Sequence, residues 1–219
     1  MLYNYWLSKL FLIINILFIG GTSYLNNTGL VPITGQNLPA IQAEAVSEKV
    51  PPFWSFVESV ADGELEVKGL YIPSVLALEV VQQPKSQSAF VSSDPDKATQ
   101  FGLASLYGTI GLLAHNYAGG ADFDDVVVGD KVNLVYGDGR IQQYRVSSIL
   151  EFQAIDPTNT RTSFVDLATQ LKATAEDLFM KVYSGKPHLT LQTCISKGSI
   201  SSWGRLFIIA EPISDETKQ

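Results

Sequence analysis

Short runs of β-branched and aromatic residues alternate with polar and turn-forming residues along most of the chain. Runs of this kind, bounded by turn residues, are typical of β-strands. The pattern predicts strands at 65–71, 77–81, 107–114, 131–136, 141–152, 188–193 and 203–210.

The clearest local prediction is a β-hairpin centred on Gly137-Asp138-Gly139. Before this turn, Val132 and Leu134 stand two positions apart with a polar residue between them, as in a strand with one buried face. Glycine supplies the positive φ that tight β-turns require.

Two helices are expected outside the strands, one near 52–60 and one over 175–183, with Thr174 or Thr169 as the N-cap and Gly185 as the stop. Many short strands with one or two peripheral helices favour a mostly β fold, built as a single closed or nearly closed β-barrel. A two-sheet sandwich is the alternative, and it is less favoured because the expected strands differ in length.

The N-terminal part of the chain has a different pattern. Residues 10–19 are apolar apart from one asparagine, and Lys9 is the only charge near them. This predicts an uncleaved membrane anchor at 1–25, with a cleaved signal segment or a buried helix as alternatives. Residues 26–50, rich in Asn, Gly, Pro, Thr and Gln, are expected to be a linker. Residues 51–219 then form one domain outside the membrane, or a secreted one if the segment is cleaved.

Composition narrows the classes of function. The 219 residues include 15 Lys and Arg against 22 Asp and Glu, a net charge of −7, so no basic excess is present to bind nucleic acid. One cysteine excludes an intramolecular disulfide and a multi-cysteine zinc cluster, and two histidines exclude a His-rich metal site. Asp122, Asp124 and Asp125 offer the oxygen ligands that calcium prefers, but such a cluster is more typical of a solvated loop. We therefore predict no metal and no cofactor.

The candidate chemistry begins with Cys194, which ends the strand-favouring run 189–193 and opens into a polar loop. A thiol at a strand end is held on one side and open on the other, which suits a nucleophile, whereas a small buried cysteine is the alternative. His115 ends the apolar run 110–114, where an imidazole serves either as an acid and base or as a structural group bonded to a carbonyl. His188 precedes the thiol by six residues, about 20 Å along a straight strand, and is not expected to reach it.

Arg205 interrupts the otherwise apolar run 202–210. Its spacing from Cys194 fits two neighbouring antiparallel strands joined by a loop. A guanidinium in this position can donate to the oxyanion that forms when a thiolate attacks an acyl carbon. An arginine on the outer face of an edge strand is the alternative.

These residues carry a resemblance to a known family. Residues 190–194, Thr-Leu-Gln-Thr-Cys, resemble the TLxTC signature of the sortases, the cysteine transpeptidases of bacterial surfaces. The order His115, Cys194, Arg205 is similar to that family as well, as are the expected anchor and linker. The similarity spans residues 68–212 and implies a barrel of the sortase type.

The resemblance also implies a mechanism. Cys194 would attack a backbone carbonyl of a sorting-motif peptide and form a thioester, and His115 would protonate the departing amine and deprotonate the incoming one. Arg205 would stabilise the tetrahedral intermediate, while Thr190 and Thr193 would contact the substrate. The acceptor would be an amine of the cell wall or of a protein, and the cysteine would sit on the outer side of the cell membrane.

The sequence also departs from the family pattern. Asn116 follows the histidine where some sortases have arginine, so no class is assigned, and the long segment 154–186 is expected to wall the substrate groove. A secreted cysteine peptidase or hydrolase stays open, as does a non-catalytic adhesion or scaffold domain with the same barrel. An L,D-transpeptidase also uses Cys, His and Arg, but its motif has His and Gly directly before the cysteine, where this chain has Gln192-Thr193.

Overall fold

A computed structural model describes residues 50–159 and 161–214 of the chain. The anchor predicted at 1–25 and nearly all of the linker predicted at 26–50 lie outside the described residues, so both stay predictions. Among the described helices, none has the length and apolar character needed to cross a bilayer.

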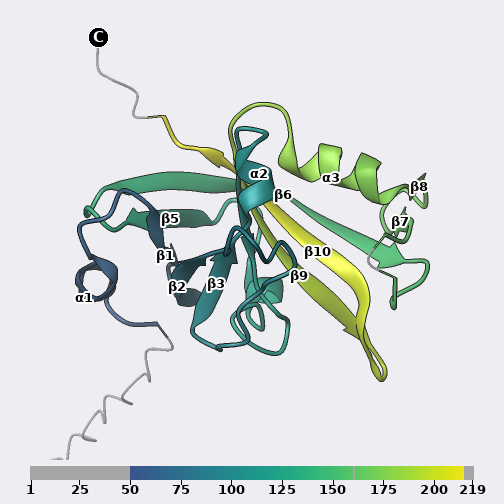
Figure 1. Cartoon of the computed structure of the whole chain (residues 1–219), viewed down its shortest axis with the longest axis horizontal. Coiled ribbons are helices and arrows are strands. Elements are labelled where there is room, and N and C mark those ends of the chain that lie inside the picture. The colour runs from purple at the N-terminus through teal and green to yellow at the C-terminus, as the bar shows by residue number, and fades with distance from the viewer. Residues whose placement is uncertain (1–49, 160, 215–219) are drawn as a thin grey trace, which may run out of the picture. The chain divides into compact units, whose positions relative to one another are not determined.

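In the described part of the chain, eight strands form a closed β-barrel (Figure 1). Their order around the barrel is β10-β9-β4-β3-β2-β1-β5-β6, and β10 pairs with β6 to close it. The strands are β1 (Val67–Ile72), β2 (Leu76–Gln82), β3 (Lys97–Gln100), β4 (Ile110–Leu113), β5 (Lys131–Tyr136), β6 (Ile141–Ala154), β9 (Leu189–Lys197) and β10 (Ile200–Pro212). The pairs β2–β3 and β4–β9 are parallel, and the other neighbours in the barrel are antiparallel. The predicted mostly β, closed barrel is therefore confirmed.

The remaining elements surround the barrel. Two short strands continue the sheet from β6, the α-helices pack on outer faces of the sheet, and a 3-10 turn adds Phe123 to the barrel core (Figure 1). They are β7 (Phe164–Asp166), β8 (Lys172–Ala173), α1 (Phe53–Val60), α2 (Gly102–Ser105), α3 (Ala175–Tyr183) and a single 3-10 turn at Phe123–Asp125.

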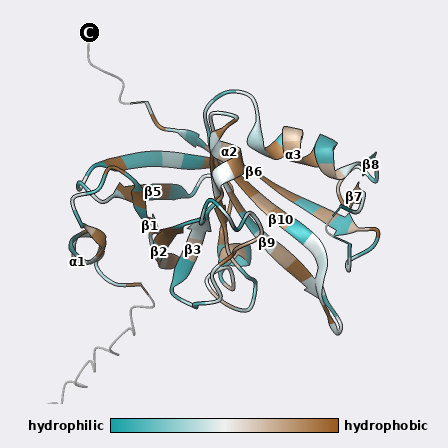
Figure 2. Ribbon diagram, in the orientation of Figure 1, coloured by the Kyte–Doolittle hydropathy of each residue, from teal (hydrophilic) through white to brown (hydrophobic). Residues whose placement is uncertain are grey.

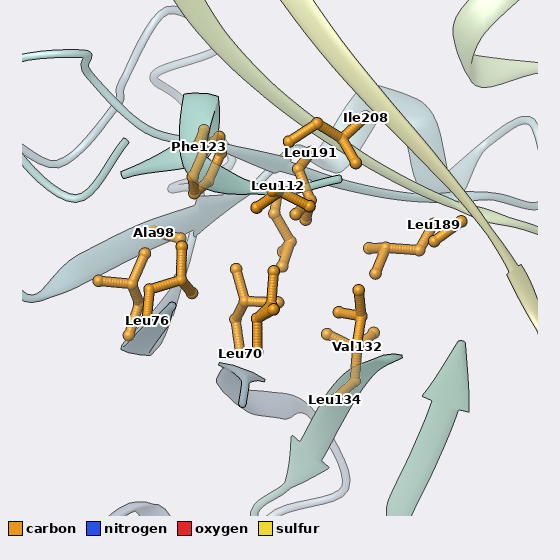
Figure 3. Packing of buried hydrophobic residues seen from close by; sticks show 14 of the residues in the cluster. Leu70, Leu76, Ala98, Leu112, Phe123, Val132, Leu134, Leu189, Leu191 and Ile208 are labelled. Carbon is orange, nitrogen blue, oxygen red and sulfur yellow. The ribbon is translucent and has the colours of Figure 1, made fainter. Parts of the chain in front are cut away.

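The barrel is filled by alternate residues of its strands. Leu189 and Leu191 of β9 and Ile208 of β10 point inward and are fully buried. They pack with Leu112 of the adjacent strand β4 and with Leu70 of β1 in one core cluster (Figure 3). Bands of hydrophobic and hydrophilic residues follow one another along the long strands (Figure 2). Because the side-chain period of a strand is two, the residues between these core positions must point outward.

Part of that outer face is covered in turn. Helix α3 packs on it through Leu178, Val182 and Tyr183, against Phe152 of β6 and Phe207 of β10. A separate cluster joins α1 to the outer face of β1 and β5. The strands β6 and β10 thus have a hydrophobic core on each side, which fixes which of their residues face inward.

The expected hairpin and the second helix are confirmed. Gly139 has a φ of 85°, and its N–H donates to the Tyr136 carbonyl at 2.9 Å. Helix α3 begins with a capping box in which the Thr174 hydroxyl accepts from the Asp177 N–H and the Asp177 carboxylate accepts in return. Thr169, the other N-cap candidate, instead lies in the turn before β8.

The strand expected at 107–114 is only partly correct. Residues 107–109 follow the short helix α2, and the strand begins at Ile110. Gly108 takes a φ of 77°, a conformation that ends the preceding turn and does not belong to a strand. The strands β3, β7 and β8 were not expected, because each is short and has no hydrophobic run of its own.

Candidate active site

Two adjacent strands and the segment after a third carry Cys194, Arg205 and His115, which we call the row. Arg205 of β10 is directly opposite Cys194 of β9 in the antiparallel register. On the other side of β9, Leu113 of β4 is opposite Gln192, and the Ala114 N–H continues this parallel ladder by donating to the Gln192 carbonyl at 3.1 Å. His115 follows Leu113 by two residues, just beyond the end of β4, as Cys194 follows Gln192 on β9, so both residues lie at the same end of these two strands.

The side chains of Cys194 and Arg205 point to the outer face of the barrel, and His115 directly follows Ala114, which belongs to the inner core. Leu112, Leu191 and Leu206 belong to the inner core, so the positions that alternate with them face outward. Neighbouring strands place side chains of one row about 5 Å apart at their Cβ atoms. Cys194, His115 and Arg205 are each half-buried, so part of each residue is open to a ligand.

The loop after the histidine is tightly packed. The His115 carbonyl accepts the N–H groups of Ala118 and Gly120, both at 2.9 Å. A Cβ at Gly119 would collide with the Lys97 carbonyl oxygen, so only glycine allows the loop to approach β3 this closely. The imidazole itself stacks on the exposed ring of Tyr117, with the ring centroids 4.9 Å apart.

The guanidinium of Arg205 is held at its own strand. Its Nη1 donates to the Ser202 carbonyl at 3.1 Å and to the Gly204 carbonyl at 2.8 Å. A guanidinium has five N–H donors, so these two bonds leave donors for a ligand. Among residues 50–159 and 161–214, no hydrogen bond or ion pair joins Arg205, Cys194 and His115 to one another. The backbone therefore brings Arg205, Cys194 and His115 near one another. Direct contacts between their side chains depend on the rotamer of each.

The other residues named from the sequence lie in different surroundings. Thr190 is fully buried, and its hydroxyl donates to the Val182 carbonyl of α3 at 2.6 Å, away from any surface that a substrate would touch. Thr193 is 5% exposed, and its Oγ1 is buried without a partner among the described residues. His188 lies near the opposite end of β9, where its two ring nitrogens face the carbonyls of Lys186 and Val182.

Asn116 is a site residue that sequence reasoning did not identify as one. Its Nδ2 donates to the Ser196 Oγ at 2.8 Å and to the Ser201 carbonyl at 2.9 Å. These bonds tie the histidine loop to the β9–β10 hairpin that carries the thiol and the guanidinium. The sequence shows Asn116 only as the neighbour of a histidine, because its partners lie 80 and 85 positions away.

Two hollows flank the row. A groove of about 280 Å³ lies beneath α3 on the outer face, lined by Arg205, Gln192 and aromatic side chains that include Phe101 and Phe207. Tyr183 in this groove donates to the Gln192 Oε1 at 2.6 Å, and burial raises the pKa of its hydroxyl, so it stays protonated.

The second hollow, of about 340 Å³, lies at the mouth of the barrel. It reaches Cys194 from the inner side of the sheet and is lined by Thr193, Asn116, Asp124 and Glu151 among others. A larger hollow of about 550 Å³ lies beside His188 and contains none of the three residues of the row. Within the described ranges, no three acidic, histidine or cysteine side chains come together as metal ligands, and this includes Asp122, Asp124 and Asp125.

The row has the parts that acyl transfer requires. A thiol serves as the nucleophile, an imidazole beside it moves protons, and a guanidinium offers donors to a developing oxyanion. A thiol attacks as its thiolate, and neighbouring cationic groups increase the thiolate fraction.

No protein-family model matches the chain, and no curated protein matches it in sequence. The chain is similar to several solved structures of sortases. Sortase C1 of Streptococcus suis is 16% identical with a TM-score of 0.47, over 75% of this chain and 79% of that one. Sortase C-1 of Actinomyces oris is 14% identical with a TM-score of 0.46, over 78% and 85%. Sortase A of Listeria monocytogenes is 16% identical with a TM-score of 0.44, over 70% and 89%.

Proposed function

We propose that this chain is a sortase-like cysteine transpeptidase, which cleaves a sorting-motif peptide through a thioester and transfers it to an amine. The observation that carries the proposal is that Arg205 stands directly opposite Cys194 on the next strand and that His115 follows the end of the strand on the other side of Cys194. The TLxTC-like segment at 190–194 supports it from the sequence.

In the proposed reaction the Cys194 thiolate adds to a peptide carbonyl carbon, and Arg205 donates to the oxyanion that forms. His115 gives a proton to the nitrogen of the departing amine as the C–N bond breaks, and a thioester is left on Cys194. An incoming amine then adds to the thioester carbon, transfers a proton to His115 and displaces the sulfur.

The groove beneath α3 is the proposed binding site of the peptide on the acyl side of the scissile bond. Its aromatic walls fit an apolar side chain, while Gln192 and Arg205 on its floor offer polar partners to a peptide backbone. The segment 154–186, expected to wall a groove, supplies Phe164 and α3 to it.

We further propose that the domain works on the outer side of the cell membrane, held there by the segment 1–25. The support is the uncharged, apolar run at 10–19. Membrane fractionation of the full chain, with protease added from outside to cells stripped of their wall, tests this. A membrane-bound domain that external protease degrades is expected, and recovery of the full chain in the cytosolic fraction would contradict it.

The decisive experiment traps the thioester. The full chain is incubated with peptides of the LPxTG type, and intact-protein mass spectrometry is used to look for an acyl adduct on Cys194. We expect an adduct in the wild type and none in Cys194→Ala. His115→Ala is expected to lose at least 100-fold in turnover, whereas His188→Gln, which keeps a donor for the nearby carbonyls, serves as the matched control with wild-type turnover.

The same experiment separates the alternatives. An adduct that resolves only with water, whatever amine is added, would indicate a hydrolase. If no peptide acylates Cys194, the barrel is a non-catalytic scaffold and the proposal is wrong.

A further inference from the structure

We propose that the hollow at the mouth of the barrel binds the acceptor, and that Asp124 and Glu151 select an acceptor with a second cationic group besides the attacking amine. This inference deepens the proposed function and rests on it. It assigns the two sides of β9 to two substrates, with the acyl peptide on the outer face and the acceptor at the mouth.

The position of the hollow follows from the alternation of the strands. Thr193 of β9 and Leu206 of β10 point into the barrel, and Glu151 of β6 is opposite Leu206, so its side chain starts on the same inner side. The loop after His115 contributes Asn116 and Asp124. An acceptor bound here would reach Cys194 from the side opposite to the groove that holds Arg205.

The charge of the hollow fits a cation. Of its lining residues, Asp124 and Glu151 are carboxylates and none is Lys or Arg. Both carboxylates belong to exposed residues, so they attract a cationic ligand without the cost of burying a charge. The groove beneath α3 differs, because its lining includes Arg205 and no acidic residue.

A buried hydroxyl gives an independent sign of a ligand. Thr193 lines the hollow at 5% exposure, and its Oγ1 is buried with no hydrogen-bond partner among the described residues. Buried hydroxyls in native proteins are nearly always paired, so an unpaired one next to a hollow indicates a missing polar partner. The space beside it depends on Gly120, because a Cβ there would lie 2.5 Å from the Thr193 Oγ1.

The transfer step explains why a second cation matters. The attacking ammonium loses one proton to solvent, and the neutral nitrogen then forms the C–N bond while the C–S bond breaks with its electron pair on sulfur. The nitrogen gives up a second proton, which passes through His115 to the sulfur, so the products are an amide and the Cys194 thiol. A lone ammonium thus loses the charge that the carboxylates attract, whereas a diamine keeps one ammonium beside them. In binding without transfer both amines stay protonated, and a diamine then offers two ammonium groups to the two carboxylates where a monoamine offers one.

The test compares two acceptors of equal length, cadaverine with two amino groups and pentylamine with one. Their binding to the full chain carrying Cys194→Ala is measured by calorimetry, and their transfer rates are measured with the active protein. We expect cadaverine to bind at least tenfold more tightly than pentylamine and to react with a matching preference. In the double variant Asp124→Asn, Glu151→Gln the preference is expected to fall to twofold or less. Glu58→Gln on α1 is the matched control that keeps the preference.

The outcomes separate this inference from the proposed function. Equal binding of the two amines, or a preference that survives the double variant, would overturn the inference even if Cys194 is acylated normally. If the preference depends on Asp124 and Glu151 but no peptide acylates Cys194, the cation site stands and the transpeptidase proposal falls.

Discussion

At the scale of single residues, a register difference of one position decides whether Cys194 is reachable. Its neighbour Thr193 points into the barrel and is almost fully buried, whereas Cys194 points outward and is half-buried. A slip of β9 by one residue would exchange the two side chains and bury the thiol. Leu189 and Leu191 prevent the slip, because it would move both from the barrel interior to the outer face.

Gly204 keeps its neighbour Arg205 in place. A Cβ at this residue would lie 2.6 Å from the Phe152 carbonyl oxygen, so a larger residue would push β10 away from β6. Arg205 would then no longer be held opposite Cys194. The glycine before the arginine is therefore a requirement of close strand approach.

The arginine provides the first prediction at this scale. Arg205→Lys is expected to lower kcat by about 100-fold, because a lysine ammonium cannot keep the two carbonyl bonds of Arg205 and also donate to an oxyanion. Steady-state turnover of the acylating peptide measures this, and calorimetry checks that the melting temperature stays within about 2 °C of wild type. Wild-type turnover in this variant would contradict the catalytic role, and the bonds of Arg205 to Ser202 and Gly204 would then be purely structural.

The residue types of the row could be predicted from the sequence, but their surroundings could not. Cys194, His115 and Arg205 each stand out as a polar residue at the end or in the middle of an apolar run. The contacts of Asn116 and the burial of Thr190 depend on segments that meet only in the folded chain. No local pattern carries that information.

At the scale of elements, the histidine loop and the β9–β10 hairpin are joined through Asn116. Asn116→Ala removes both hydrogen bonds and frees the loop that carries His115. We expect kcat to fall about tenfold with little change in KM, because the imidazole loses its position while the groove stays intact. The acid limb of the pH–rate profile is expected to shift, a change that a purely structural role would not cause.

A graded control is available in the same contact. Ser196→Ala removes one of the two partners and leaves the Ser201 carbonyl, so its effect on kcat is expected to lie between those of wild type and Asn116→Ala. An effect equal to that of Asn116→Ala would mean that the hydrogen bond to Ser196 alone holds the loop against the hairpin. No effect in either variant would contradict a positioning role.

Asp166 connects β7 to α3 and gives a prediction about pH. Its Oδ1 accepts the N–H groups of Ala168 and Thr169, both at 3.0 Å, and its Oδ2 accepts from the Lys181 Nζ at 3.2 Å. These partners lower the pKa of the carboxyl, the Thr169 N–H most of all, followed by Lys181. A lowered pKa in the folded state stabilises the fold above the unfolded-state value of about 3.9. This stabilisation is lost as the pH falls through the lower folded value.

Asp166→Ala is therefore expected to lower the free energy of unfolding by about 1–3 kcal/mol at pH 7. The difference from wild type should shrink as the pH is lowered from 4 to 2, where the wild-type carboxyl is also protonated. Urea unfolding across this range measures it. Lys181→Met, which removes only the half-exposed ion pair, should cost less than about 1 kcal/mol. A difference that stays constant with pH would show that the charge of Asp166 does not matter.

Elements with a strong local signal were predicted well. Helix α3 has a capping box and a glycine with a φ of 108° just beyond its end, and the β5–β6 turn has its own glycine. The strand β3 has no such signal, since its four residues form a strand by pairing with β2 and β4. Strands of that kind exist through long-range pairing, which periodicity along the chain does not record.

At the scale of the whole molecule, closure of the barrel creates the site. The long strand β10 pairs with β9 on one side and with β6 on the other, and it carries Arg205 where all three strands meet. The barrel interior packs against one face of these strands and α3 against the other. The part of the sheet that carries the reactive groups is therefore packed on both faces close to the site. Such packing holds reactive groups at fixed positions.

Barrel closure also predicts which part of the chain folds by itself. Every strand of the barrel lies between Val67 and Pro212, and the α1 cluster needs only residues from Val50 onward. A chain lacking residues 1–43 is therefore expected to remain folded and soluble, with a single cooperative melting transition. Removal of 1–61 deletes α1 as well, uncovers Tyr71, and should lower the melting temperature by roughly 5–15 °C. Size-exclusion chromatography and calorimetry of both forms test this, and aggregation of the first would mean that residues 1–43 belong to the hydrophobic core.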